Sequence, residues 1–292
     1  MTTRIQIPAG KVRSTTARVV AAALLSVGLV AATLAATAPA TSAAAEPTAH
    51  KAAKPAPPAI VEQVDPKSVE ALRRMSAYLQ SLSAFELTSQ TSLDLVLHDG
   101  QKVLVDGVAR YKVRRPAGFV IDVESNMKTR RFFYDGKQFT IVAPKLGYFA
   151  TVAAPPTNRE ALEVLWTRYR VALPLEDLFR WSDPSGARDV SLESGFRAGT
   201  AIVDGVETEQ YVFREPGFDW QVWIQTGDQP LPRKIVIVDL SDPARPAYTA
   251  RLTWNVTPTI TADDFTFRPG KDAHLVHLGV VAPQGGRGGS RE

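Results

Sequence analysis

From Phe85 onwards, apolar side chains recur at every second position, which is the period of a β-strand with one buried face. The first run extends from Phe85 to Leu97, and a turn signal at residues 98–101 separates it from the next run. About eleven such runs follow one another through short connections, without strand–helix–strand alternation. The sequence therefore predicts a mainly β protein with helices (α+β), built on a strongly curved antiparallel sheet in meander order.

A helical period precedes the strands. Asp65 is a suitable N-cap residue, and Pro66 suits the first helical position. The apolar residues that follow are three or four positions apart and share one face of a helix: Val69, Leu72, Met75, Leu79 and Leu82. The charged residues of the segment lie on the other side: Lys67, Glu70, Arg73 and Arg74. We expect this N-terminal helix to cover the sheet with one face and to meet water with the other.

A second helical segment interrupts the strands at residues 158–181. Thr157 and Glu160 match a capping box, and Pro174 separates a first helix from a shorter one that reaches Trp181. We expect this segment to form a lid over the concave face. With the N-terminal helix, it would cover the curved sheet.

The first 45 residues have the order of a secretory signal: a basic stretch that ends at Arg18, an uncharged apolar run, and then small residues. We predict a cleavable signal peptide and a periplasmic protein, with a membrane anchor formed by the uncleaved segment as the alternative. The predicted regions are the signal peptide at 1–45, a Pro- and Ala-rich linker at 46–64, the folded domain at 65–278 and a disordered tail at 279–292.

Composition excludes several classes of function. The chain has no cysteine, which excludes disulfides, thiolate metal sites and a lipid-modified N-terminal cysteine. It has 34 basic and 30 acidic residues, but four of the basic residues lie in the first 45 positions, where there is no acidic residue. The remaining chain is neutral overall, so binding to nucleic acid is not expected.

Residues with catalytic or metal-binding potential are few. Of the four histidines, His274 and His277 lie close together in sequence, and their strand-like surroundings would place them on opposite faces. Asp263 and Asp264 are adjacent acids, which we interpret as solvated turn residues because neighbouring side chains point apart. No nucleophile elbow, phosphate loop or dinucleotide motif is present. We expect no enzymatic activity, no metal site and no cofactor.

The ligand site is predicted on the concave face. Ser89, Thr91, Gly107 and Ala109 share a property: they are small residues at inward-facing positions midway along two successive strands. A filled core would have larger side chains there, so we expect space between the sheet and the helical lid. The residues expected to cover this space from the helical segment are Leu162, Leu165, Trp166, Tyr169 and Phe179.

Three segments carry a resemblance to a known superfamily: residues 175–181 (LEDLFRW), residues 223–234 with their Trp-Ile and Pro-Leu-Pro-Arg-Lys motifs, and residues 265–269 (FTFRP). The order of the predicted elements is also shared: a helix, a meander, a helical insert and a second set of strands. In both respects the chain is similar to the LolA/LolB-like lipoprotein-carrier superfamily. Within it, the chain most resembles a family of predicted periplasmic proteins with a domain of unknown function. The resemblance implies an incomplete β-barrel with a helical lid, and carriage of an acyl chain or a lipidated protein in an apolar cavity. The chain departs from the lipoprotein members because it has no cysteine that could be acylated.

These observations predict a non-enzymatic protein of the periplasm or cell envelope that binds a lipid, an acyl chain or a lipidated protein, with peripheral membrane contact. One alternative is a regulatory or assembly module that senses such a ligand and binds an envelope protein partner. A hydrolase without a recognisable motif is the second alternative.

Overall fold

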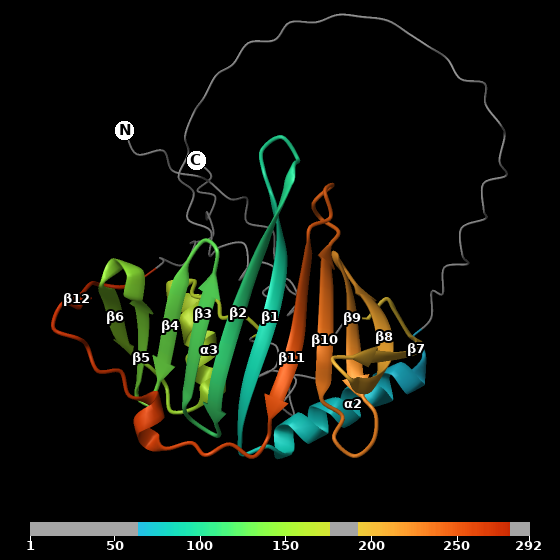
Figure 1. Cartoon of the computed structure of the whole chain (residues 1–292), viewed down its shortest axis with the longest axis horizontal. Helices are drawn as coiled ribbons and strands as arrows, with labels where there is room; N and C mark the ends of the chain where they lie inside the picture. The colour runs from blue at the N-terminus through green and yellow to red at the C-terminus, as the bar shows by residue number, and fades with distance from the viewer. Residues whose placement is uncertain (1–63, 176–191, 281–292) are drawn as a thin grey trace, which may run out of the picture.

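The computed structural model of the chain describes residues 64–175 and 192–280 (Figure 1). The predicted signal peptide, almost all of the predicted linker and most of the predicted tail lie outside the described residues, as do Phe179 and the expected second short helix. The described helices are α2 (Pro66–Ser81) and α3 (Asn158–Tyr169), with the short 3₁₀ helices η1 (Pro144–Leu146) and η3 (Ala262–Phe265). The strands are β1 (Ala84–Val96), β2 (Lys102–Arg114), β3 (Phe119–Ser125), β4 (Thr129–Tyr134), β5 (Gln138–Ala143), β6 (Tyr148–Ala153), β7 (Ser194–Val203), β8 (Val206–Glu215), β9 (Phe218–Gln225), β10 (Pro232–Asp239), β11 (Ala247–Asn255) and β12 (His274–Leu275).

Twelve strands form one open, curved sheet in the order β12-β6-β5-β4-β3-β2-β1-β11-β10-β9-β8-β7. The order contains two meanders, β1 to β6 and β7 to β11, as expected for antiparallel strands with short connections. They are joined at the centre of the sheet by antiparallel pairing of β1 with β11, which runs from Glu86 opposite Asn255 to Leu93 opposite Tyr248. The predicted curved sheet, open rather than closed into a barrel, is confirmed.

One pairing departs from the expected antiparallel pattern. β12 contributes two residues that pair in parallel with Tyr148 and Phe149 of β6, so the sheet is mixed. The chain reaches β12 after crossing the outer face of the sheet, and it arrives in the same direction as β6. The alternation of apolar residues predicts which segments are strands, and short turns predict which strands are neighbours. No short turn connects β6 with β12, so the sequence did not predict this pairing.

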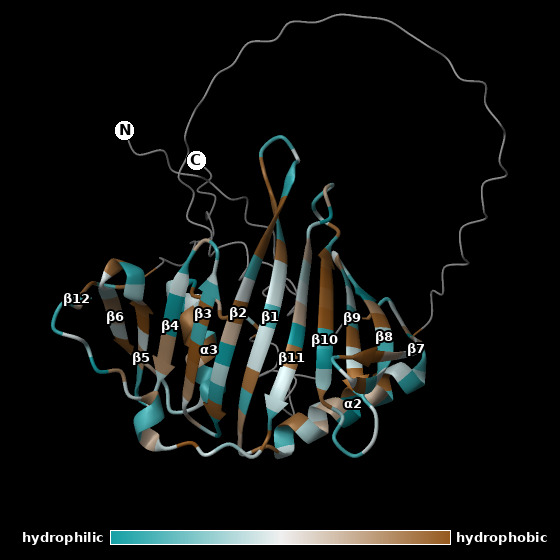
Figure 2. Cartoon of the chain, viewed as in Figure 1, coloured by the Kyte–Doolittle hydropathy of each residue, from teal (hydrophilic) through white to brown (hydrophobic). Residues whose placement is uncertain are grey.

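The two faces of the sheet have separate cores, which follow the alternation of side chains along each strand (Figure 2). The larger core combines buried residues of α2 and α3 with the inward positions of β1 to β5 and β8 to β11. Both helices therefore lie on the same, concave face of the sheet. The smaller core, on the outer face, joins Val120 and Phe133 to Phe265 from the C-terminal part of the chain.

The helix α2 begins and packs as its sequence predicts. The Asp65 carboxylate accepts a hydrogen bond from the amide of Lys67 (2.9 Å), and Pro66 occupies the first turn. Met75 and Leu79 are almost completely buried. A Cβ atom at Gly195 of β7 would lie 2.8 Å from the ring of Phe213 on the neighbouring strand β8 and 3.1 Å from the hydroxyl oxygen of Ser68 in α2. The missing Cβ therefore permits close packing against both the neighbouring strand and the helix.

The helix α3 is attached to the end of β2 by its first residue. Thr157 caps the helix: its hydroxyl accepts from the amide of Glu160 (3.2 Å), which is one half of the predicted capping box, and donates to the Glu160 carboxylate (2.7 Å). The buried side chain of Asn158 accepts from the amide of Gly118 (2.9 Å) and donates to the carbonyl of Arg114 (2.8 Å). These bonds place α3 across the concave side of β3 and β4, where Figure 1 shows it behind these strands.

The segment 256–276, which we call the C-terminal strap, crosses the outer face of β3 and β4 and ends at β12. Phe265 is 1% exposed and lies against Gly118, whose φ of +125° and missing Cβ leave room for the ring. Asp264 does not behave as a solvated turn residue, contrary to the sequence prediction: it forms an ion pair with Lys112 of β2 (2.6 Å). Asp263, by contrast, is highly exposed and forms an ion pair with Arg268 at 3.2 Å. Within the described ranges, no helix combines the length and the apolar character needed to span a membrane.

Candidate functional site

The predicted small residues meet at the centre of the concave face, where β1 lies between β2 and β11. Ser89 stands opposite Ala109 of β2 and Leu252 of β11, and Thr91 stands opposite Gly107 and Ala250 in the same way. We call the inward-facing positions Ser89, Thr91, Ala109 and Ala250 the central strip. Ser89, Ala109 and Ala250 of the strip are at most 2% exposed, and larger side chains of both meanders flank them.

Gly107 has a different role from the one its sequence position suggests. A Cβ atom there would lie 2.8 Å from the carbonyl oxygen of Glu124 on β3 and 3.3 Å from the hydroxyl oxygen of Thr91. The Thr91 hydroxyl donates to the carbonyl of Gly107 at 3.2 Å. The glycine therefore permits the close approach of neighbouring strands, and it does not by itself open space for a ligand.

Buried hydroxyl groups border the central strip. Burial raises the pKa of Tyr248 far above its ordinary value, and the nearby Ser89 hydroxyl opposes this shift. The two groups do not form a hydrogen bond of normal geometry, and neither has another partner among the described residues. Burial likewise raises the pKa of Tyr111, whose hydroxyl donates to the carbonyl of Pro174 (3.0 Å). The centre of the concave face thus combines small side chains with two hydroxyls that can accept or donate a further hydrogen bond.

The lid residues of α3 divide into two groups. Leu162 and Leu165 are buried and belong to the same core as Ala109. Trp166 and Tyr169 are only half-buried, and their rings lie beside guanidinium groups: Arg170 is 5.5 Å from the Trp166 ring centre, and Arg168 is 5.9 Å from that of Tyr169. The sequence predicted all four as cover for one space; in the structure Leu162 and Leu165 belong to the main core, Tyr169 is partly buried against that core, and Trp166 is half-buried. Phe179 lies outside the described residues.

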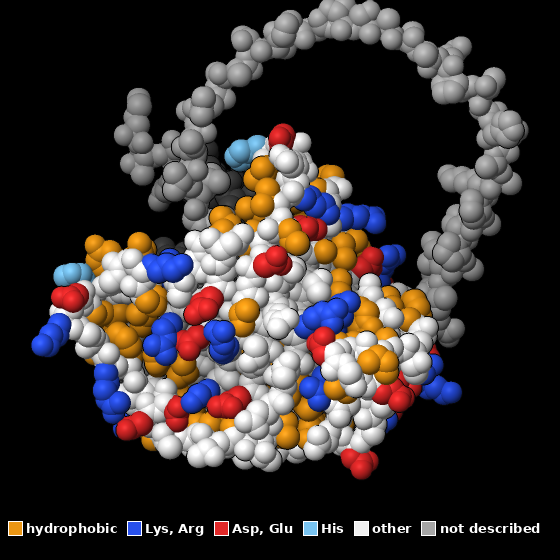
Figure 3. Space-filling view, in the orientation of Figure 1, with side chains coloured by type: hydrophobic (Ala, Val, Ile, Leu, Met, Phe, Trp, Pro, Cys, Tyr) orange, Lys and Arg blue, Asp and Glu red, His pale blue; other side chains and the backbone are white. Residues whose placement is uncertain are grey.

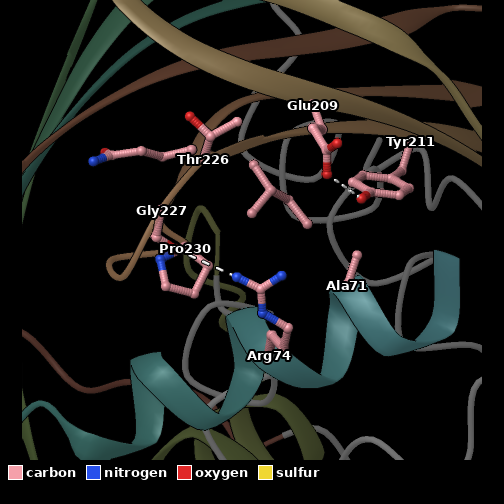
Figure 4. Close-up of a pocket in the computed structure, with 9 residues that line it drawn as sticks. Ala71, Arg74, Glu209, Tyr211, Thr226, Gly227 and Pro230 are labelled. Atoms are coloured by element: carbon pink, nitrogen blue, oxygen red, sulfur yellow. Dashed lines mark hydrogen bonds between the residues drawn. The ribbon is translucent and has the colours of Figure 1, made fainter. Parts of the chain in front are cut away.

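A pocket that the sequence did not predict lies between α2 and the second meander (Figure 4). It has a volume of about 230 Å³. Its lining combines apolar core residues with polar groups: Ala71, Arg74, Glu209, Tyr211, Ile224, Gln225, Thr226, Gly227 and Pro230. Arg74, assigned from sequence to the water-facing side of its helix, extends from α2 into this pocket. One sequence signal could have placed Arg74 at this pocket: it lies three residues after Ala71, so the two side chains are neighbours on the helix.

The charges at this pocket are unequally satisfied. Glu209 accepts hydrogen bonds from the Tyr211 hydroxyl (2.6 Å) and from Arg197 (2.8 Å), and these contacts hold the pKa of Glu209 below its ordinary value. Burial raises the pKa of Tyr211 to about 12, with a further contribution from the bond to Glu209. Arg74 makes one long hydrogen bond, to the carbonyl of Gly227 at 3.4 Å, and no ion pair among the described residues.

A second pocket, of about 350 Å³, lies on the outer face beside the C-terminal strap. It is lined by charged residues that are already paired, such as Lys112 with Asp264 and Arg131 with Asp122. Figure 3 shows acidic and basic side chains interspersed over this face of the central strands. The described residues contain no group of three His, Asp or Glu side chains that could hold a metal ion.

An open, curved sheet with both helices on its concave face defines the class of protein: an incomplete barrel of the kind expected from the resemblance to the LolA/LolB-like superfamily. The chain belongs to a family described as predicted periplasmic proteins (DUF2092), whose model matches residues 68–279. The family predicted from sequence is therefore confirmed. No curated protein matches the chain significantly.

Solved structures with a similar fold have little sequence identity to the chain. An uncharacterized conserved protein from Thermus thermophilus is 12% identical, with a TM-score of 0.43, and the match covers 72% of this chain and 99% of that one. The lipoprotein LppX from Mycobacterium tuberculosis is 14% identical, with a TM-score of 0.43, and the match covers 68% of this chain and 100% of that one. A LolA superfamily protein from Nitrosomonas europaea is 8% identical, with a TM-score of 0.34, and the match covers 68% of this chain and 97% of that one.

Proposed function

We propose that this protein is a non-enzymatic binding protein of the periplasm, exported by a cleavable signal in its first 45 residues. Its ligand is the acyl chain of a lipid or of a lipidated protein, held on the concave face between α2 and α3. The family to which the chain belongs, one of predicted periplasmic proteins, supports the compartment. The basic–apolar–small order of the first 45 residues supports the route.

The observation that carries the proposal is the central strip. At the middle of a large apolar face, where packing would favour leucine or phenylalanine, the chain has Ser89, Ala109 and Ala250. The hydroxyls of Ser89 and Tyr248 have no partner there among the described residues. An acyl chain laid over the strip would be held by apolar contact, at ~0.8 kcal/mol for each methylene group removed from water.

The test compares substitutions on the two faces of the β1–β2 pair. Thr91→Leu and Ala109→Leu add volume at the central strip, whereas Thr88→Leu adds the same side chain to the outer face of β1. We expect the first two variants to weaken binding of a fluorescent fatty acid and the third to leave it unchanged. Mass spectrometry of an organic extract of the purified protein would identify the natural ligand.

The outcome that overturns the proposal is equally specific. If the wild-type protein binds no fluorescent fatty acid, or if Thr91→Leu and Ala109→Leu both bind it as well as Thr88→Leu does, the concave face does not hold an acyl chain. Urea unfolding of each variant shows that a loss of binding does not arise from a loss of fold.

A second candidate function, a module that binds an envelope protein partner, is favoured by the β1–β2 hairpin. β11 pairs with β1 only as far as Leu93, and β3 pairs with β2 only from Gly107, so the hairpin beyond them has no further strand partner among the described residues. Figure 1 shows it projecting past the rest of the sheet. Its end exposes large apolar side chains: Leu97 and Val103 are each 40% exposed, and Leu104 is 56% exposed. Cross-linking from this hairpin in the periplasm, with and without added lipid, separates a partner-binding sensor from a simple carrier.

A further inference from the structure

We propose that Arg74 forms an anion-binding subsite at one end of the ligand site and binds the carboxylate or phosphate group of an acyl ligand. The inference rests on the proposed function and adds the chemical class of the ligand: a long apolar chain that ends in an anionic group. It places the anionic group in the pocket between α2 and β8–β9, and the apolar chain along the concave face toward the central strip.

The pocket has the form of a headgroup site. Its floor consists of Ala71, Tyr211 and Ile224, which belong to the main core, and its rim contains Thr226 and the backbone of Gly227. Figure 4 shows the Arg74 side chain extending from α2 into the space below Glu209 and Tyr211. The pocket volume of about 230 Å³ suits a small polar group and is too small for a whole lipid.

The charges leave Arg74 available for a ligand. Glu209 is the acidic side chain that lines the pocket, and its carboxylate already accepts hydrogen bonds from Arg197 and Tyr211. With Arg74, Arg197 and Glu209 counted together, the net charge is positive. A guanidinium group binds a carboxylate or phosphate by paired, charge-assisted hydrogen bonds, and the single 3.4 Å bond to Gly227 leaves most of the Arg74 donors free among the described residues.

The register of the sheet connects the pocket to the central strip. Val222 of β9 pairs with Ile235, Ile235 with Ala250, and Ala250 with Thr91 of β1, so Ile224, two residues along β9 from Val222, lies close to the level of the central strip along the strands. Four inter-strand spacings of about 4.8 Å separate β9 from β2, a span of about 19 Å. This span is comparable to the length of an extended long-chain fatty acid. A ligand of this length would span the distance from Arg74 to the central strip.

The experiment compares two neighbouring arginines and three ligands with the same hydrocarbon chain. Arg74→Gln removes the proposed anion contact. Arg73→Gln is the matched control, because Arg73 is exposed on the same helix and forms an ion pair with Glu70 (3.6 Å) outside the pocket. Binding of palmitate, hexadecyl phosphate and hexadecanol is measured for each protein by displacement of a fluorescent fatty acid.

We expect Arg74→Gln to weaken binding of palmitate or hexadecyl phosphate about tenfold, the effect of losing a hydrogen bond to a charged group, and to leave hexadecanol unchanged. The anion whose binding is weakened more identifies the headgroup. Arg74→Lys should restore part of the lost affinity. The control variant Arg73→Gln should alter none of the three affinities. Equal loss for the alcohol and the anions, or no loss for either, overturns the subsite while the acyl-binding proposal stands. If the wild-type protein binds none of the three ligands, the acyl-binding proposal itself is wrong.

Discussion

The ammonium group of Lys112 lies 2.6 Å from a carboxylate oxygen of Asp264, although 152 positions separate the two residues in the sequence. Asp264 also accepts hydrogen bonds from the amide and the hydroxyl of Thr261, both at 2.8 Å. The bond from Lys112, followed by those from Thr261, lowers the pKa of Asp264 to about 2. This carboxylate therefore both caps η3 and ties the C-terminal strap to the centre of the sheet.

The first prediction concerns the acid stability that this ion pair provides. Because the pKa of Asp264 is lower in the folded protein, its stabilisation is fully present above the pKa of an unfolded aspartate, about 4, and is lost as the pH falls towards about 2. Both side chains are partly exposed, so water screens the pair and Asp264→Asn should lower the free energy of unfolding at neutral pH by only ~1 kcal/mol. Urea unfolding at several pH values should show the difference between wild type and variant shrinking between about pH 4 and about pH 2.

The adjacent acid is the control for this prediction. Asp263 forms its ion pair with Arg268, and both side chains are more than two-thirds exposed, at 76% and 69%. Asp263→Asn should change neither the neutral stability nor its pH dependence measurably. If both variants behave alike, the contact with Lys112 does not hold the strap.

The second prediction concerns the attachment of α3. Asn158→Ala removes one acceptor for the amide of Gly118 and one donor for the carbonyl of Arg114, in a buried position. We expect a loss of ~2 kcal/mol in the free energy of unfolding, because buried polar groups lose their partners. Asn158→Asp keeps the acceptor but brings a negative charge towards the Arg114 carbonyl, so it should be no more stable than Asn158→Ala. A stability equal to wild type in both variants would show that α3 is held by its apolar contacts alone.

The third prediction separates the core side of α3 from its edge. Leu165 is 1% exposed, so Leu165→Ala should lower the free energy of unfolding by ~2–5 kcal/mol. Trp166 is half-buried, so Trp166→Ala should cost less than the ~3–5 kcal/mol typical of a fully buried tryptophan. If Trp166 covers a ligand, its removal should speed the release of a bound fluorescent fatty acid, measured by stopped-flow. A large stability loss with unchanged release would assign Trp166 to the core and remove it from the lid.

The fourth prediction concerns the N-terminus. The proposed signal should be removed between about Thr41 and Glu46, where the run of small residues ends. Intact-mass measurement of the protein from a periplasmic extract tests this directly. A protein that retains its first residues and is found in the membrane fraction would instead be anchored by the uncleaved segment.

The elements that local spacing determines could be predicted from the sequence. The start of α2 at Asp65 and Pro66, the N-cap at Thr157 and the strands with one buried face depend on residues a few positions apart. The pairing of β1 with β11 depends on contacts between residues far apart in the chain. The alternation of side chains indicates which face is buried but not which strands are neighbours.

The site was harder to predict than the fold, and two residues show why. A glycine in a strand marks either a space or a close approach of backbones, and Gly107 is the second case because its missing Cβ faces the Glu124 carbonyl. Arg74 lies between the exposed and the buried faces of α2. It lines a pocket because the β9–β10 loop lies opposite it in the folded protein. Neither distinction is encoded in local spacing.

The pairing of β1 with β11 also determines when the protein can finish folding. It joins Glu86 to Asn255, which are 169 positions apart, so the first meander keeps an open edge until nearly the whole domain has been made. Contacts between such distant residues form slowly, because a long loop must close before they contribute. For a chain exported by a cleavable signal, as proposed above, late completion of the sheet would be an advantage: the polypeptide would stay unfolded while it crosses the membrane, and the pairing of β1 with β11 would form only after the last long strand has emerged.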